Sequence, residues 1–164
     1  HGQVSSGVNP EWNNNPYNVA NGGPCERTWD FFTNETAEDF YKRRMHYIVA
    51  RWGHSPAIFS WELFNEIDWT DNYGGHAGEI TDWHLRQARY INSLDVNDHL
   101  ISTSYAKFEN EPDLWNAEEI DYTQTHFYIE SSDMQSIHLS AINEYLTSYN
   151  KPTMLGEFGI GHSG

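Results

Sequence analysis

Cysteine is almost absent from this sequence, which has Cys25 alone among its 164 residues. An intrachain disulfide and a thiolate metal site both require more than one cysteine, so neither can form within the chain. No apolar stretch approaches the roughly 20 residues that a membrane-spanning helix needs, and no segment resembles a secretory signal peptide. We therefore expect no membrane partner, while the redox compartment stays open.

Basic residues are also scarce. Nine lysines and arginines stand against 24 aspartates and glutamates, which gives a formal net charge of −15. Such a charge repels nucleic-acid phosphates and anionic membrane surfaces, so we expect no nucleic-acid partner and favour a neutral ligand. The chain lacks a glycine-rich phosphate loop, a Gly-x-Ser-x-Gly elbow and a His-Glu-x-x-His motif. Nucleotide-binding, serine hydrolase and zinc protease functions therefore have no support.

The hydrophobic pattern predicts an alternation of helices and strands after a long loop. Residues 2–33 are rich in asparagine, glycine and proline, which indicates turns and loops. Beyond them, the spacing of apolar residues predicts a helix over about 33–52, with Thr33 as its cap and Gly53 as its stop. It predicts further helices over 78–94 and from 132 or 133 onwards, and a short turn before 118. Strands are predicted over 57–63, 99–104, 122–127 and 152–158. Alternation of this kind predicts an α/β fold with a parallel sheet, either doubly wound or closed into a (β/α)₈ barrel.

Two glutamates lie where predicted strands end. Glu66 follows the strand over 57–63, and Glu157 comes near the end of the strand over 152–158. Ligands of parallel α/β folds meet the carboxyl ends of the strands, so these side chains can face one another across a substrate. Cleavage of a glycosidic bond needs such a pair, one group to protonate the leaving oxygen and one to attack or to activate water. Taken alone, each glutamate is more often an ordinary surface or ion-paired residue. Their joint placement at two predicted strand ends, with His126 and Tyr128 at a third, favours function.

At these residues the chain resembles glycoside hydrolase clan A, and most closely family 5, which contains cellulases and mannanases. The family has Asn-Glu at the end of its fourth barrel strand, which Asn65-Glu66 matches, and His-x-Tyr on the sixth strand, which His126-Phe127-Tyr128 matches. Its nucleophile on the seventh strand is matched by Glu157, and His-Gly on the third strand is matched by His1-Gly2. The likeness runs over essentially the whole chain. The combined spacing is specific, whereas each motif alone is not.

The resemblance implies a retaining β-glycoside hydrolase that cleaves β-linked glucan or mannan by double displacement, without a cofactor or a metal ion. Glu66 would be the acid/base and Glu157 the nucleophile. A carbohydrate would be the substrate, and we expect a secreted or periplasmic location. Protein partners, the sugar, the linkage and the oligomeric state stay open.

The resemblance also implies roles for the neighbouring residues. Asn65 would hydrogen-bond the sugar 2-hydroxyl, Tyr128 would orient Glu157, and His126 and His1 would line the subsite of the scissile sugar. A full barrel of this kind typically needs ~250 residues. We therefore expect residues 1–164 to be a single catalytic domain segment, an incomplete TIM barrel from about strand three to strand seven.

Aromatic residues in the predicted loops could stack on sugar rings. Trp12 and Trp69 are the best candidates for such a role, although either could instead attach a loop to the barrel. Three other tryptophans, Trp52, Trp61 and Trp83, are predicted to pack in the core or between helices. A structural metal ion near Asp68, Asp71 and Asn72 is a less favoured alternative.

Two rival functions remain open. The first is a catalytically inactive carbohydrate-binding barrel that has kept the cleft; the presence of both glutamates argues against it. The second is a different (β/α)₈ enzyme, such as a metal-dependent lyase or an aldolase. An aldolase would need a Schiff-base lysine at a strand end, and Lys107 and Lys151 are poorly placed for that role.

Overall fold

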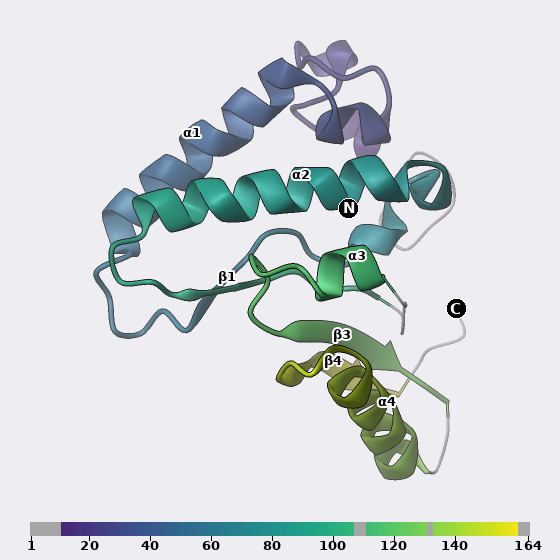
Figure 1. Cartoon of the computed structure of the whole chain (residues 1–164). Coiled ribbons are helices and arrows are strands. Elements are labelled where there is room, and N and C mark those ends of the chain that lie inside the picture. Colours follow the sequence, from purple (N-terminus) through teal and green to yellow (C-terminus); the bar gives the residue numbers. More distant parts are fainter. Residues whose placement is uncertain (1–10, 107–110, 131–132, 161–164) are drawn as a thin grey trace.

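The structure is a computed structural model that describes residues 11–106, 111–130 and 133–160. It has a mixed α/β architecture in which helices lie on the outside of parallel strands (Figure 1). The helices are α1 (Glu35–Trp52), α2 (Tyr73–Leu94), α3 (Pro112–Trp115) and α4 (Met134–Tyr149), with short 3-10 turns η1 (Trp12–Asn14), η2 (Val19–Asn21), η3 (Thr28–Phe32) and η4 (Ile67–Trp69). The strands are β1 (Ser60–Glu62), β2 (Leu100–Ser102), β3 (Thr123–Tyr128) and β4 (Thr153–Gly159).

The strands run parallel and in the order in which they occur in the chain. β1 pairs with β2, and β3 pairs with β4. A parallel bridge between Tyr105 and Thr125 joins the two pairs, and the backbone amide of His126 donates to the carbonyl of Tyr105 at 2.7 Å. The predicted parallel α/β arrangement is therefore confirmed, and the carboxyl ends of the strands meet along one edge.

Helix α1 shows how the sequence defines an element. The side chain of Asn34 accepts a hydrogen bond from the amide of Ala37 at 3.1 Å, which caps the helix one residue after the predicted cap, Thr33. Acidic residues occupy the first turn, where they complement the helix dipole. Gly53 follows the last helical residue, as predicted.

An aromatic cluster forms the core between α1, α2 and the turn η3. The indole of Trp83 is fully buried, with its ring centroid 4.8 Å from that of Tyr41 and 5.4 Å from that of Phe31. Trp61 is buried as predicted. The prediction for Trp52 is wrong: it is 45% exposed, because it is the last residue of α1 and its ring lies edge-on to the exposed Tyr47.

Helix α2 starts earlier than predicted. It begins at Tyr73 instead of near residue 78. The phenol of Tyr73 lies 2.8 Å from the Tyr105 hydroxyl and donates to Glu111 Oε1 at 2.8 Å. Burial raises the pKa of Tyr73, so this hydroxyl stays protonated and keeps its donor. These tertiary contacts hold the first turn of α2 beside the segment that follows β2.

Asp95 ties the end of α2 to β1 at the amino-terminal ends of the strands. Its Oδ2 atom accepts from the Trp61 indole at 2.6 Å and lies 2.8 Å from His99 Nδ1. Burial pushes the pKa of the Asp95 carboxyl upward, but hydrogen bonds from Trp61, His99 and the backbone outweigh it and hold the pKa below its usual value. The ionised carboxylate is therefore the form that stabilises the fold.

This arrangement predicts a pH-dependent loss of stability in Asp95→Asn. We expect the substitution to lower the free energy of unfolding by about 2 kcal/mol at pH 7. Because the folded pKa lies below the unfolded value of about 4, the stabilisation is complete above that value and disappears as the pH falls through the folded pKa. Urea unfolding at pH 7 and pH 3 measures the gap, with exposed Asp82→Asn as the control. A gap of equal size at both pH values would contradict this assignment.

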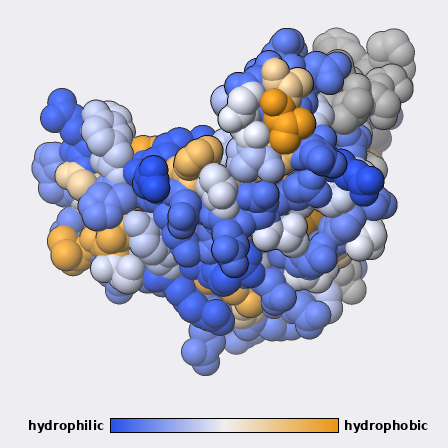
Figure 2. All heavy atoms as spheres, turned by 90° about the horizontal axis from the view of Figure 1, so that it is seen from above, coloured by the Kyte–Doolittle hydropathy of each residue, from blue (hydrophilic) through white to orange (hydrophobic). Residues whose placement is uncertain are grey.

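The surface is largely hydrophilic, with apolar residues in scattered groups (Figure 2). This matches the strongly acidic composition of the chain.

Among the residues that the structure describes, no helix has both the length and the apolar character needed to cross a bilayer.

Candidate active site

Glu66 is held at the carboxyl end of β1 by the neighbouring strand. Its backbone is in the left-handed region, with φ of 49°, which is uncommon for a residue other than glycine. Ser104, just beyond β2, fixes this conformation: its Oγ accepts from the amide of Glu66 at 3.0 Å, and its carbonyl accepts from the amide of Ile67 at 3.1 Å. Strained backbone of this kind is characteristic of functional sites. The carboxylate is 12% exposed.

Glu157 approaches the same point from β4. It pairs in register with His126 on β3, so the two side chains project from neighbouring strands. His126 is nearly buried, with a side chain 2% exposed, whereas the Glu157 side chain is 44% exposed. An accessible carboxylate beside a fixed imidazole is suited to contact with a ligand that enters from solvent.

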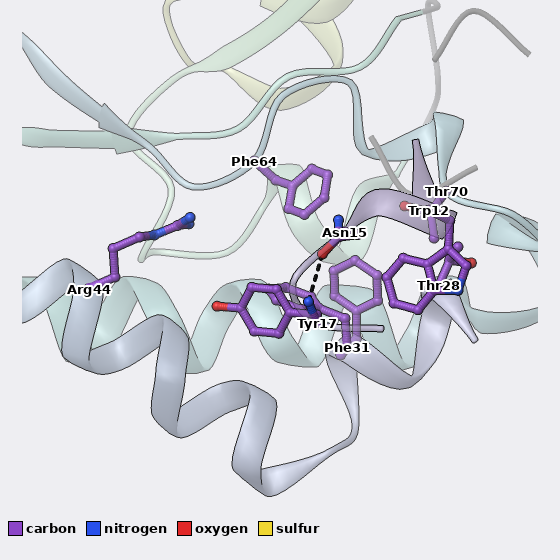
Figure 3. A pocket seen from close by; sticks show the side chains of 9 residues that line it. Trp12, Asn15, Tyr17, Thr28, Phe31, Arg44, Phe64 and Thr70 are labelled. Carbon is purple, nitrogen blue, oxygen red and sulfur yellow. Dashed lines mark hydrogen bonds between the residues drawn. The ribbon is translucent and has the colours of Figure 1, made fainter. Parts of the chain in front are cut away.

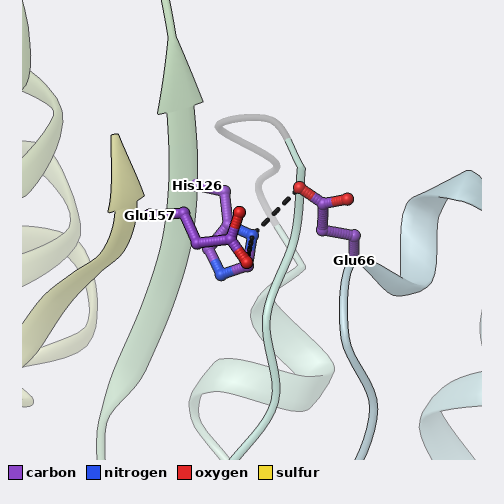
Figure 4. A group of neighbouring side chains, drawn as sticks. All are labelled: Glu66, His126 and Glu157. Carbon is purple, nitrogen blue, oxygen red and sulfur yellow. Dashed lines mark hydrogen bonds and ion pairs between the residues drawn. The ribbon is translucent and has the colours of Figure 1, made fainter. Parts of the chain in front are cut away.

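The two glutamates and His126 form one compact cluster (Figure 4). One carboxylate oxygen of Glu66, one of Glu157 and one ring nitrogen of His126 all lie within 4.8 Å of one another. His126 Nδ1 lies 3.0 Å from Glu66 Oε1 and 3.6 Å from Glu157 Oε1. The imidazole therefore contacts both carboxylates, which project toward a common point from β4 and from the segment between β1 and η4 (Figure 4).

Tyr128 adds a second contact to Glu157. Its hydroxyl donates to Glu157 Oε2 at 2.8 Å, and it stands two residues after His126 on the same face of β3. The hydrogen bond to the carboxylate, together with the charge of that group, raises the pKa of Tyr128. The phenol therefore remains a donor, and it orients the carboxylate of Glu157.

The other site residues predicted from the sequence lie at different places. Asn65 is exposed directly beside Glu66, and Trp69 is half-buried in the turn η4 that follows. His1 lies outside the described residues.

Trp12 is not open to a ligand in this structure. It is 4% exposed and lies beside Phe31 along a small cavity (Figure 3). Its backbone carbonyl accepts from the amide of the Asn18 side chain at 3.0 Å, which folds the segment back on itself. Its burial supports the alternative in which this tryptophan attaches the loop to the core.

Sequence reasoning missed several residues around the cluster. Ser104 supports Glu66, and Gly156 and Gly159 flank Glu157 on β4. Gln124 lies below His126 on β3 and donates to Glu62 Oε1 at 3.1 Å. Only their positions near predicted strand ends could have drawn attention to them.

The cluster is also the group within the described residues that could hold a metal ion. Asp68 and Asp71, named above for the alternative metal position, do not belong to such a group within the described residues. Asp68 Oδ1 instead accepts from the backbone amide of Ala106 at 2.7 Å. Two carboxylates and an imidazole can either hold a divalent cation or act directly on a substrate.

The sequence is similar to curated mannan-degrading enzymes. It is 30% identical over 155 residues to mannan endo-1,4-beta-mannosidase F of Aspergillus clavatus, covering 80% of this chain and 34% of the relative. It is 40% identical over 80 residues to mannan endo-1,4-beta-mannosidase A of Podospora anserina, covering 49% of this chain and 20% of the relative. The chain thus spans a fifth to about a third of these relatives. No protein-family model matches the chain.

Solved structures agree on the fold. An endo-1,4-beta-D-mannanase of Thermotoga petrophila superposes with a TM-score of 0.71 at 21% identity, covering 90% of this chain and 51% of that structure. A beta-glucuronidase of Bifidobacterium dentium superposes with a TM-score of 0.57 at 15% identity, covering 78% of this chain and 21% of that structure. By sequence and by fold, this chain is a homologue of the mannan endo-1,4-β-mannosidases, and its resemblance to glycoside hydrolase clan A, family 5, is confirmed.

Proposed function

We propose that this chain carries the catalytic pair of a retaining endo-β-mannanase, with Glu157 as nucleophile and Glu66 as acid/base. The observation that carries the proposal is the approach of their carboxylate oxygens to within 4.8 Å. Retaining glycosidases hold their carboxyl groups about 5–5.5 Å apart, whereas inverting enzymes leave about 6.5–9.5 Å for a water molecule. An approach within this limit supports double displacement.

In the first step, the Glu157 carboxylate attacks the anomeric carbon while Glu66, in its acid form, protonates the departing glycosidic oxygen. The carbon–oxygen bond to the leaving sugar breaks, and a covalent glycosyl-enzyme ester forms. Tyr128 donates to Glu157 Oε2 and so fixes the plane of the attacking carboxylate. Asn65, exposed beside Glu66, supplies an amide for the 2-hydroxyl.

In the second step, Glu66 has become a carboxylate and takes a proton from water. The water oxygen attacks the anomeric carbon and displaces Glu157, which releases the sugar with its original configuration. His126 contacts both carboxylates and keeps Glu66 directed toward the anomeric centre throughout. No step requires a metal ion or a cofactor.

We propose further that the described strands are consecutive strands of a (β/α)₈ barrel. β1 would be the fourth strand and β4 the seventh, in one catalytic domain segment over residues 1–164. The parallel strand order supports this placement. So do the apolar side chains exposed near the amino-terminal strand ends, Phe59, Leu100 and Met154, which line a hollow that further strands would cover. We call a protein that contains this chain within such a closed barrel the complete enzyme.

The same proposal sets the substrate and the location. A neutral β-linked mannan suits a protein of net charge −15, which would repel polyanions. A polysaccharide substrate also fits a secreted or periplasmic enzyme. Nucleic acid and membranes are not expected partners.

The stereochemistry of the product tests the proposed function. We expect the complete enzyme to hydrolyse β-1,4-linked mannan, and ¹H NMR of the first products to show the β-anomer before mutarotation. Release of the α-anomer would contradict double displacement. Binding of mannan with no turnover, unchanged in Glu157→Ala, would instead support the inactive carbohydrate-binding barrel.

A further inference from the structure

The pairing between β3 and β4 shifts by one residue just before Glu157. Thr125 pairs with Leu155. The next residue, His126, pairs with Glu157, which leaves Gly156 without a partner on β3. An extra residue of this kind is a β-bulge, and bulges beside active sites re-aim side chains.

The bulge determines which face of the sheet Glu157 occupies. In an unbroken register, His126 would pair with Gly156, and the side chain of Glu157 would point to the opposite face. With the bulge, Gly156 and Glu157 both line the hollow that also contains His126. The extra residue therefore brings Glu157 Oε1 to 3.6 Å from His126 Nδ1.

Gly156 also leaves space for the imidazole of His126. A Cβ atom at this position would lie 3.1 Å from His126 Nε2 and 3.0 Å from Gln124 Cδ, closer than nearly all real contacts of this kind. Gln124 is itself held by its hydrogen bond to Glu62. A side chain at position 156 would therefore displace the ring whose other nitrogen contacts both proposed catalytic carboxylates.

Gly159 leaves space for the ring of Tyr128 in the same way. The two residues pair across the strands, and a Cβ atom at position 159 would lie 3.2 Å from both Cδ1 and Cε1 of the tyrosine ring. Tyr128 is 52% exposed, so this contact is an important limit on the position of its ring. In this position the Tyr128 hydroxyl donates to Glu157 Oε2.

We propose that Gly156 and Gly159 are positioning residues. By lacking a side chain they leave space for the rings of His126 and Tyr128, and together with the bulge they direct Glu157 toward the anomeric carbon. This inference rests on the proposed function, since it gives the two glycines a role in the step that Glu157 performs. Each acts through the aromatic ring that lies over it.

Alanine substitutions in the complete enzyme test the inference. A misplacement of about 1 Å in a catalytic group can cost roughly 10²-fold in rate. A Cβ atom at either position would move its neighbouring ring by a few tenths of an ångström. We therefore expect Gly156→Ala and Gly159→Ala each to lower kcat by roughly 3- to 10-fold while KM changes little. The control is Gly78→Ala in α2, where a Cβ atom would meet nothing within 4 Å. This control should keep the kcat of the parent enzyme.

A double-mutant cycle separates positioning from general destabilisation. If Gly159 acts by fixing the position of the Tyr128 hydroxyl, the double variant Gly159→Ala, Tyr128→Phe should have the same kcat as Tyr128→Phe alone. Losses that multiply would overturn the role of Gly159. This cycle also carries the test if Gly156→Ala does not fold.

A comparison with Glu157→Gln separates the role of the two glycines from the proposed function. Full activity in Glu157→Gln would refute the proposed function itself. An inactive Glu157→Gln beside alanine variants that turn over like the parent enzyme would refute only the role of the glycines.

Discussion

Replacing Glu157 with glutamine is expected to lower kcat of the complete enzyme on mannan by about 10⁴-fold or more, because the amide cannot form the glycosyl-enzyme ester. Glutamine keeps the size of the side chain and an oxygen that can accept from Tyr128. The substitution therefore removes the nucleophile with little change in packing. Initial rates of reducing-end release on β-1,4-mannan measure the loss.

The matched control for this change is Glu144→Gln, an exposed position on α4. It alters the net charge by the same amount and should leave kcat unchanged. If Glu157→Gln retained activity within the range of this control, Glu157 could not be the nucleophile. Equal losses in both variants would show that the assay responds to charge and not to chemistry.

Replacing Glu66 with alanine is expected to lower kcat on mannan by about 10³-fold, which is the usual contribution of a general acid/base. The loss should depend on the leaving group. A dinitrophenyl β-mannoside needs no protonation of its leaving oxygen, so the first step should remain fast while the second becomes slow. Stopped-flow absorbance should then show a burst of dinitrophenol followed by slow turnover.

Added azide provides the contrasting measurement for the same variant. Azide needs no base to remove a proton, so it should accelerate the second step of Glu66→Ala and yield the β-mannosyl azide. The parent enzyme should show no such acceleration. Equal losses on mannan and on the dinitrophenyl substrate, with no effect of azide, would remove Glu66 from the acid/base role.

Much of the fold could be predicted because local signals and tertiary packing agree. The apolar spacing of α1 and its polar cap lie within one residue of the structure. The start of α2 could not be predicted, since Gly74, Gly75 and Gly78 lower the helix propensity of its first turns. Contacts of Tyr73 with residues far along the chain hold that turn in place.

The candidate site could be predicted only in part from the sequence. Strand ends placed Glu66, His126, Tyr128 and Glu157 near one edge, and the structure brings these four together. The support from Ser104 could not be predicted, because it depends on how β1 and the segment after β2 align. The same applies to the bulge before Glu157 and to the burial of Trp12, which both depend on partners distant in sequence.

The proposed mechanism depends on Glu157 forming a covalent bond to the sugar, and trapping of that intermediate tests the bond most directly. A 2-deoxy-2-fluoro β-mannosyl fluoride slows both steps, so the glycosyl-enzyme should accumulate in the complete enzyme and can be located by peptide mass spectrometry. We predict a single adduct on Glu157 that Tyr128→Phe forms more slowly. An active enzyme whose adduct lies on any other residue would contradict the account.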